Sequence, residues 1–160
     1  MISVDIKETG NAISEVGKVR CFCLNSTGTM KYTNGNEFRG IWKNNQMYWG
    51  ELKQINGDVY TGYFENNKFS GQGKIKCNNG LILSGEFKDG EVLDKAKLIF
   101  ENGNIFEGEV KDLDIGENGK MIYSDGIVYE GCFRDGLKHG FGIQTTVSGD
   151  KYIGYWEDDK

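Results

Sequence analysis

The sequence predicts an all-β protein, an antiparallel meander of hairpin repeats. Three observations predict it: a glycine that recurs every 22 or 23 residues, apolar side chains two residues to either side of that glycine, and Asn-Gly or Asp-Gly pairs further along each repeat. Glycine accounts for 24 of the 160 residues and proline for none. This composition is typical of many tight turns joined by strands in which every backbone N–H can donate.

Seven glycines, which we call the anchor glycines, set the repeat. They are spaced 23 residues apart, except for a step of 22 from the second to the third. A fixed period in this range indicates a repeat protein in which one small structural unit is stacked on the next. The anchors are Gly17, Gly40, Gly62, Gly85, Gly108, Gly131 and Gly154.

The first strand of each repeat is centred on its anchor. Side chains two apart point to one face of a strand, so each anchor shares a face with the residues two before and two after it. The other face is mixed, with Arg39 and Lys43 as examples, which predicts half-buried strands. At the last six anchors all twelve flanking positions are apolar and ten are aromatic: Phe38 and Trp42, Tyr60 and Phe64, Leu83 and Phe87, Phe106 and Val110, Tyr129 and Phe133, Tyr152 and Trp156.

A second strand is expected to begin about thirteen residues after each anchor, beyond a glycine-bearing loop. Asp94 and Ala96 replace the paired loop glycines in one repeat and Glu117 replaces one in the next, so we expect local irregularity there without loss of the sheet. The clearest second strands are expected at 30–32, 75–77, 98–100 and 121–123.

Tight turns are expected between each second strand and the next anchor. Asn79-Gly80, Asn102-Gly103 and Asp125-Gly126 are the strongest short hairpin signals in the chain. We expect both central residues of these turns to have positive φ, as a type I′ turn requires.

Composition argues against several classes of function. The net charge is −5, which disfavours a nucleic-acid binder and weakens simple attraction to anionic lipid. The four cysteines, Cys21, Cys23, Cys77 and Cys132, form no C-x-x-C pair, and with one histidine they do not predict a zinc site. No segment has the length and apolarity of a membrane-spanning helix or a signal peptide, so we expect a cytoplasmic protein with reduced thiols.

The sequence resembles the MORN repeat, whose pattern is Y-x-G-x-W/F-x-x-G-x-x-x-G-x-G. Residues 129–142 fit this pattern, and residues 60–73 fit it with Asn67 in place of one glycine. The resemblance covers a degenerate repeat at 14–35, five full repeats at about 36–150 and a half repeat at 151–160, after an N-terminal segment at 1–13. It implies an elongated, twisted single-layer sheet of about seven hairpins with an aromatic-lined groove.

No catalytic or cofactor site is predicted. His139 lies in the glycine-bearing loop, where the MORN pattern often has histidine, and we interpret it as a turn residue. The G-x-G segments at 71–73 and 140–142 are followed by no helix and no G-K-[ST], which excludes a phosphate-binding loop. We therefore expect no enzyme activity, no metal and no cofactor.

The aromatic face is the candidate partner site. The rings in the middle of the array are expected to cover the sheet, while a single layer leaves some of the face open to a peptide or helix. The last strand is expected to accept a partner strand or a second copy. The candidates are Phe38, Trp42, Tyr60, Phe64, Phe87, Phe106, Tyr129, Phe133, Tyr152 and Trp156.

The resemblance implies a non-catalytic scaffold in a larger assembly, cytoskeletal or ciliary, within the cytoplasm. The alternative is a module that binds phosphoinositide headgroups at a membrane, which the acidity and the three arginines of the chain disfavour.

Overall fold

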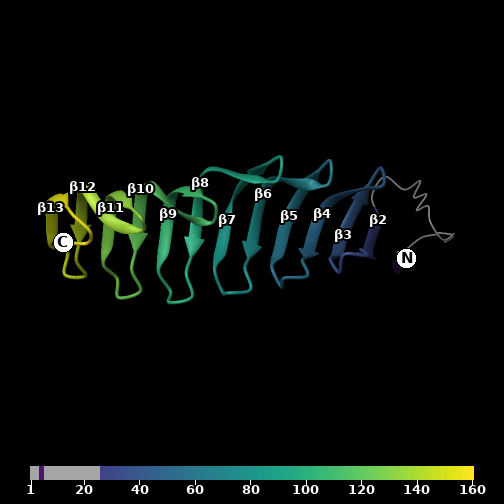
Figure 1. Cartoon of the computed structure of the whole chain (residues 1–160), viewed down its shortest axis with the longest axis horizontal. Coiled ribbons are helices and arrows are strands. Elements are labelled where there is room, and N and C mark those ends of the chain that lie inside the picture. The colour runs from purple at the N-terminus through teal and green to yellow at the C-terminus, as the bar shows by residue number, and fades with distance from the viewer. Residues whose placement is uncertain (1–3, 6–25) are drawn as a thin grey trace. The chain divides into compact units, whose positions relative to one another are not determined.

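A computed structural model of the chain describes residues 4–5 and 26–160, which form strands joined by turns (Figure 1). The sheet order follows the chain order and neighbouring strands are antiparallel, so the predicted all-β meander is confirmed. The strands are β1 (Val4–Asp5), β2 (Ser26–Lys31), β3 (Glu37–Lys43), β4 (Gln46–Lys53), β5 (Val59–Glu65), β6 (Lys68–Lys76), β7 (Ile82–Lys88), β8 (Glu91–Ile99), β9 (Ile105–Lys111), β10 (Asp114–Ile122), β11 (Val128–Arg134), β12 (Leu137–Thr145) and β13 (Lys151–Trp156).

The chain divides into two compact units. Unit 1 contains residues 1–78 and 87–91, and unit 2 contains residues 79–86 and 92–160. Most of the N-terminal segment at 1–13 and of the degenerate repeat at 14–35, including Gly17, Cys21 and Cys23, lies outside the described residues.

In both units the glycines of neighbouring strands stand directly opposite one another. We call this line of residues the glycine row. Ala96 takes a place in it and still pairs with Gly108 in a continuous strand, as expected for a repeat that keeps its sheet. In unit 1 the row is Gly28, Gly40, Gly50, Gly62 and Gly73, and in unit 2 it is Ala96, Gly108, Gly119, Gly131, Gly142 and Gly154.

The second strand of each hairpin begins earlier than predicted. β6 and β12 start six residues after their anchors and include the glycine segments that the sequence assigned to a loop. The predicted loop is wrong because a two-residue turn closes the hairpin directly after the first strand. Asn66 and Asn67 form one such turn, with φ of 50° and 60°. Positive φ at both positions is the mark of a type I′ turn, whose twist matches that of the flanking strands.

A β-bulge in the second strand takes up the extra residues of each hairpin. Cys132 lies opposite the three residues 139–141, because Gly131 pairs with Gly142 and Phe133 with Lys138. In the β3–β4 hairpin the bulge contains Tyr48 alone. The repeat of 22 residues is therefore short by one bulge residue, and its strands are unaffected.

The bulge persists where its glycine is replaced. Gly71 and Gly140 have positive φ in their bulges, at 60° and 68°. Glu117 takes the equivalent place in the bulge of β10, opposite β9, and it is not among the described residues with positive φ. The irregularity expected at Glu117 is thus a different backbone conformation within the same bulge.

The turns at the Asn-Gly and Asp-Gly pairs differ from the predicted type. The Gly103 N–H donates to the Phe100 carbonyl oxygen (3.0 Å), and the Phe100 N–H donates to the Asn104 carbonyl oxygen (2.9 Å). Gly103 has φ of 86°, whereas Asn102 does not have positive φ. This is the three-residue loop in which a type I turn is followed by one left-handed glycine. The Asn102 side chain closes it by accepting the Asn104 N–H at 3.0 Å.

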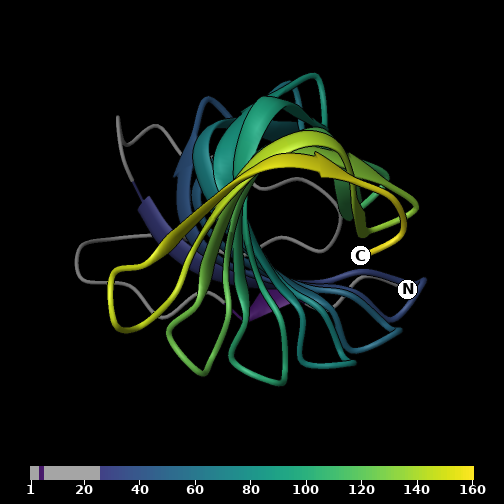
Figure 2. The same ribbon diagram turned by 90° about the vertical axis from the view of Figure 1, so that its left-hand side faces the viewer.

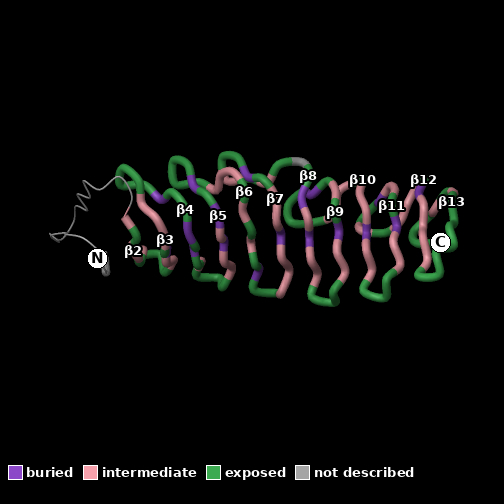
Figure 3. The backbone as a smooth tube through the Cα atoms, turned by 180° about the vertical axis from the view of Figure 1, so that it is seen from behind, coloured by how far each residue is buried: buried purple, intermediate pink, exposed green. Residues whose placement is uncertain are grey.

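The core lies on the face that the anchors share with their flanking residues. Figure 2 shows that the strands bend strongly, and Figure 3 shows buried positions recurring along them, with exposed turns between. The described core contains Phe38, Met47, Leu52, Tyr60, Phe64, Cys77 and Phe87 in unit 1, and Leu83, Ala96, Leu98, Phe106, Val110, Met121, Tyr129 and Phe133 in unit 2.

Candidate interaction surface

Most of the predicted groove residues are in the cores of the two units. Tyr152 is 53% exposed, and Trp42 and Trp156 are half-buried. The accessible part of the predicted groove is therefore at Trp42 and at β13. The other seven rings are at most 5% exposed: Phe38, Tyr60, Phe64, Phe87, Phe106, Tyr129 and Phe133.

The rings bury one another by a repeated edge-to-face arrangement. The Tyr129 ring meets Phe133 of its own repeat at 5.1 Å between centroids and Trp156 of the next repeat at 5.4 Å. Phe38 and its two neighbours in unit 1 repeat this geometry, which aromatic pairs favour. Tyr152 meets Trp156 at 5.0 Å, and the described residues place no further ring on its other side.

The glycine row provides the space in which these rings lie. A Cβ atom on Gly62 or Gly73 would come within 2.5 Å of the Tyr60 hydroxyl oxygen. That hydroxyl donates to the Tyr63 carbonyl oxygen at 2.9 Å. Tyr129 lies over Gly131 and Gly142 in the same way. Aromatic coverage of strand glycines therefore explains why the repeat requires them.

Burial changes the chemistry of the two tyrosines. It raises the pKa of Tyr60 and of Tyr129 to about 12, because the phenolate would lose its hydration. The Tyr129 hydroxyl donates to the Cys132 carbonyl oxygen at 2.9 Å. Both phenols are therefore neutral structural donors at physiological pH.

The repeat anchored at Gly85 uses aliphatic groups in place of an aromatic ring. Leu83 replaces the ring and is 1% exposed. A Cβ on Gly85 would lie 3.0 Å from the Ala96 Cβ and 3.2 Å from Val92 Cγ2. The methyl groups of Ala96 and Val92 therefore fill space next to Gly85, so the row accepts Ala96 here.

A cluster of aromatic side chains is exposed on the outer face of unit 1, opposite the core. We call Tyr48, Trp49 and Tyr63, which are 39%, 43% and 43% exposed, the aromatic patch. Trp49 and Tyr63 stand opposite each other on β4 and β5, and the Tyr48 and Tyr63 rings meet edge-on at 5.9 Å. Our sequence interpretation missed this patch because it treated the outer face as uniformly mixed. The available signal was an aromatic residue directly after the Gly62 anchor.

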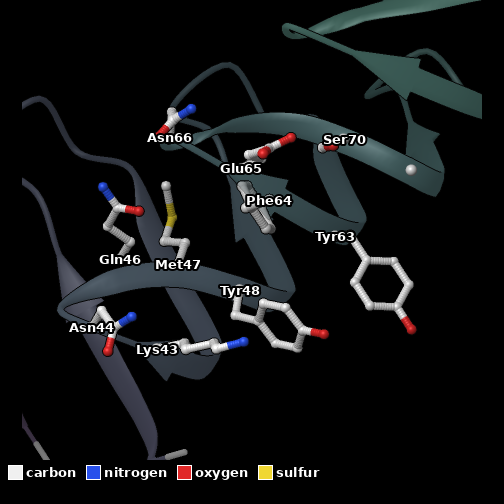
Figure 4. A pocket seen from close by; sticks show the side chains of 11 residues that line it. Lys43, Asn44, Gln46, Met47, Tyr48, Tyr63, Phe64, Glu65, Asn66 and Ser70 are labelled. Carbon is white, nitrogen blue, oxygen red and sulfur yellow. The ribbon is translucent and has the colours of Figure 1, made fainter. Parts of the chain in front are cut away.

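A shallow pocket of about 380 Å³ lies beside the aromatic patch (Figure 4). Its lining includes the buried side chains of Met47 and Phe64, together with Tyr48 and Tyr63. The Lys43 ammonium lies 5.2 Å from the centre of the Tyr48 ring, a cation–π distance. The surface can therefore hold one apolar side chain among polar neighbours.

The edge strand β13 exposes apolar side chains on both of its faces. Ile153 and Tyr155 on one face are 59% and 79% exposed, and Tyr152 on the other face is 53% exposed. Tyr155 meets the exposed Phe141 ring at 5.6 Å. Within residues 26–160 no strand pairs with the side of β13 that faces away from β12. The strand therefore presents free backbone donors and acceptors beside these side chains.

His139 lies in the bulge of β12, where the sequence predicted a loop. Its Nδ1 is 3.4 Å from an Asp158 carboxylate oxygen, and the same oxygen accepts a hydrogen bond from Arg134 at 2.9 Å. The Arg134 hydrogen bond holds the pKa of Asp158 below its ordinary value. This cluster connects β11 and β12 to the turn after β13.

The described part of the chain contains no group of three or more His, Cys, Asp and Glu side chains placed to hold a metal ion. Within the same residues, no helix has the length and apolarity that a membrane span needs. Cys77 is buried, and Cys132 is a free thiol in a half-buried position.

Comparison with known proteins identifies the repeat. No curated protein matches the chain. Among solved structures, the chain is similar to the TCP domain of SAS-4 from Drosophila melanogaster, determined in complex with a proline-rich motif of Ana2, with 16% identity over 94% of this chain and 99% of that chain and a TM-score of 0.41. The family model of the MORN repeat matches residues 60–82 and 129–151. These two segments contain the ring, glycine and bulge that recur in both units, and they are MORN repeats.

Proposed function

We propose that this protein is a non-catalytic interaction scaffold, a cytoplasmic subunit of a larger cytoskeletal or ciliary assembly. The observation that carries the proposal is the aromatic patch, which is exposed although the core rings are already covered. Tyrosine and tryptophan side chains combine a large apolar area with a polar tip, and they are enriched at protein interfaces. The cytoskeletal setting is an expectation from the family resemblance.

Two surfaces serve this function. The aromatic patch binds a partner on the outer face of unit 1. At β13, an added strand from a partner or a second copy covers Tyr152, Tyr155 and Trp156. Tyr152 and Trp156 belong to the predicted aromatic groove and are accessible. The buried rings support these surfaces from within and contact no partner themselves.

Binding to phosphoinositide or to another anionic membrane lipid is the second candidate function. It is favoured by exposed cations on the outer face of unit 1, namely Arg39, Lys53, Lys74 and Lys76. It is disfavoured by the net charge of −5 and by the carboxylates of Glu37 and Glu51 on the same face.

Native size in source-cell lysate tests the scaffold. We expect the tagged protein to sediment in a large particle that resists detergent, and a Trp49→Ser/Tyr63→Ser variant to shift toward the free chain. A Leu113→Ser/Leu137→Ser variant is the matched control, since it removes two side chains of similar exposure, 37% and 40%, from unit 2.

The alternatives give different results in the same experiment. Sedimentation with membranes that is abolished by detergent would support the lipid-binding function over the scaffold. A free 18 kDa wild-type chain would contradict both functions.

A further inference from the structure

Two rows of side chains run beside the aromatic patch on the outer face of unit 1. The nearer row contains Arg39, Glu51, Thr61 and Lys74, opposite one another on β3, β4, β5 and β6. The farther row contains Glu37, Lys53, Val59 and Lys76 on the same strands. The residues two positions from Trp49 and Tyr63, about 7 Å along their strands, are Glu51 and Thr61. Arg39 and Lys74 lie beside these two residues on the neighbouring strands, diagonal to the patch.

The cations of these rows make no close ion pair within the described residues, although Arg39 lies opposite Glu51 and Lys53 lies opposite Glu37. Arg39, Lys53, Lys74 and Lys76 are exposed, and within residues 26–160 none of them forms an ion pair. Among the described residues of unit 1, one ion pair lies on this face, between Lys31 and Glu37 at 3.6 Å. Unpaired cations beside exposed aromatic rings are available to a ligand that has both carboxylates and apolar groups.

The charge of the chain is divided unequally between the units. The segments of unit 1 contain eleven basic and nine acidic residues, and those of unit 2 contain eight basic and fifteen acidic residues. The exposed aromatic patch is thus in the half of an acidic protein that is itself weakly basic. This placement favours an anionic partner at the patch.

We propose that the outer face of unit 1 binds an acidic peptide segment of a partner protein that also carries apolar side chains. Its apolar side chains pack on the aromatic patch, and one of them enters the pocket over Met47 and Phe64. Its carboxylates meet Arg39 and Lys74. This inference rests on the scaffold function proposed above and names the class of partner.

The arrangement of charges favours a peptide over other polyanions. Glu51 lies between Arg39 and Thr61 in the nearer row, so the cations do not form a continuous track. A phosphate backbone or a lipid surface presents closely spaced negative charges, and the Glu51 carboxylate would repel them. A peptide can place its carboxylates at Arg39 and Lys74 and leave a neutral residue at Glu51.

Direct binding tests the proposal with the purified chain. The probe is a fluorescent synthetic peptide rich in Glu and Phe, compared with its Gln-for-Glu and Ser-for-Phe counterparts, and anisotropy gives the affinity. We expect the Glu/Phe peptide to bind, and both counterparts to bind at least about tenfold more weakly. Added salt is expected to weaken binding because the cations are exposed.

Matched variants test whether peptide binding depends on the charges beside the aromatic patch or on the net charge of the chain. Arg39→Glu/Lys74→Glu is expected to weaken binding at least about tenfold, as is Trp49→Ser/Tyr63→Ser. Lys111→Glu/Lys120→Glu changes the net charge by the same amount in unit 2 and is expected to leave the affinity unchanged. Circular dichroism confirms that each variant is folded, and the charge variants alter only exposed or half-buried side chains.

Several results would overturn the proposal. They are failure of the Glu/Phe peptide to bind, equal loss in the Lys111/Lys120 control, or tighter binding of single-stranded DNA or phosphatidylserine vesicles. If the peptide fails but the Trp49/Tyr63 variant still leaves its native particle, the partner class is wrong and the scaffold stands. If the native particle is also unaffected by that variant, the function assigned to the patch is wrong too.

Discussion

The two units have the same inner face and different outer faces. In unit 2 the outer row beside the glycines alternates in sign across β8 to β11, as Lys97, Glu107, Lys120 and Glu130. Lys97 and Glu107 form an ion pair at 2.9 Å. In the equivalent row of unit 1, Arg39 lies opposite Glu51 and Lys74 lies opposite Thr61, and within residues 26–160 neither cation forms an ion pair.

Apolar side chains on the outer faces differ in the same way. The next outer row of unit 2 consists of neighbouring half-buried aliphatic side chains, Ile99, Ile105, Ile122 and Val128. Unit 1 has Val59 and three charged residues at these positions. On the other side of the glycine row both units expose aromatic rings, Trp49 and Tyr63 in unit 1 and Phe141 and Tyr155 in unit 2. The outer faces therefore differ most across β8 to β11, where unit 2 pairs Lys97 with Glu107 and groups aliphatic side chains, while the corresponding rows of unit 1 contain exposed cations. The inner pattern is fixed by the fold, and the outer positions are free to specify a partner.

The inner faces should respond alike to loss of the glycine row, and this is the largest expected effect. A Cβ on Gly131 would lie 2.6 Å from the Gly142 Cα and 2.7 Å from the Tyr129 hydroxyl oxygen. Gly131→Val and Gly62→Val should each lower the free energy of unfolding by about 3 kcal/mol, through displacement of the ring and of the neighbouring strand. Urea unfolding followed by circular dichroism measures this.

Ala96→Gly is the matched control, because it restores the repeat pattern and removes one methyl group. It should lower the free energy of unfolding by no more than about 1 kcal/mol. If Gly131→Val had the same free energy of unfolding as the wild type, the covering rings would not require glycine at these positions. A large loss in one unit alone would show that the inner faces are not equivalent.

The buried tyrosines should give a smaller effect, again equal in the two units. Tyr60→Phe and Tyr129→Phe each remove a hydrogen bond to a backbone carbonyl and should lower the free energy of unfolding by about 1 kcal/mol. Urea midpoints of the single variants at neutral pH measure this. Unequal losses would indicate that one hydroxyl contributes more than its geometry suggests.

The same tyrosines predict a pH dependence. Their pKa is raised from 10.0 to about 12 in the folded chain. Their contribution is therefore fully present below about pH 10 and is lost as the pH rises toward 12. The double Phe variant should lose stability less steeply over this interval than the wild type. Identical slopes would assign the alkaline loss to other groups.

The part of the fold that the sequence predicts well is the part set by side-chain direction. A ring, a glycine and a ring at spacing two must share one face of a strand, so the inner face of β5 or β11 can be read without a structure. The same alternation indicates antiparallel strands. The repeated pattern then predicts the meander because consecutive strands pair.

Turn types and bulges could not be predicted in the same way. Asp112 and Leu113 form a turn with positive φ at both positions and no glycine, at 51° and 65°, so the tight turn has no clear sequence signal there. Asn102-Gly103 has the signal and adopts another turn. Conformation at these places is set by how the paired strands must close, which residue preference alone does not specify.

The aromatic patch shows the consequence for site prediction. Tyr48 lies in the bulge of β4, where counting by two no longer gives the face of the sheet. Its position beside Tyr63 requires the cross-strand register. The ten predicted groove residues, in contrast, were correctly placed on one face, while their burial depends on strand bending that the sequence pattern does not encode.

The smallest expected effect separates stability from binding on the outer faces. Lys97→Glu would place a carboxylate opposite Glu107 and should lower the free energy of unfolding by about 0.5 kcal/mol at low salt, a loss that 1 M NaCl removes by screening. Lys74→Glu has Thr61 opposite it and should leave stability unchanged while it weakens acidic-peptide binding. Urea unfolding at two salt concentrations, with anisotropy on the same samples, measures both. If Lys74→Glu lowered the free energy of unfolding and Lys97→Glu did not, Lys74 would contribute to stability and Lys97 would not. The charge difference between the outer faces could then not be assigned to partner binding.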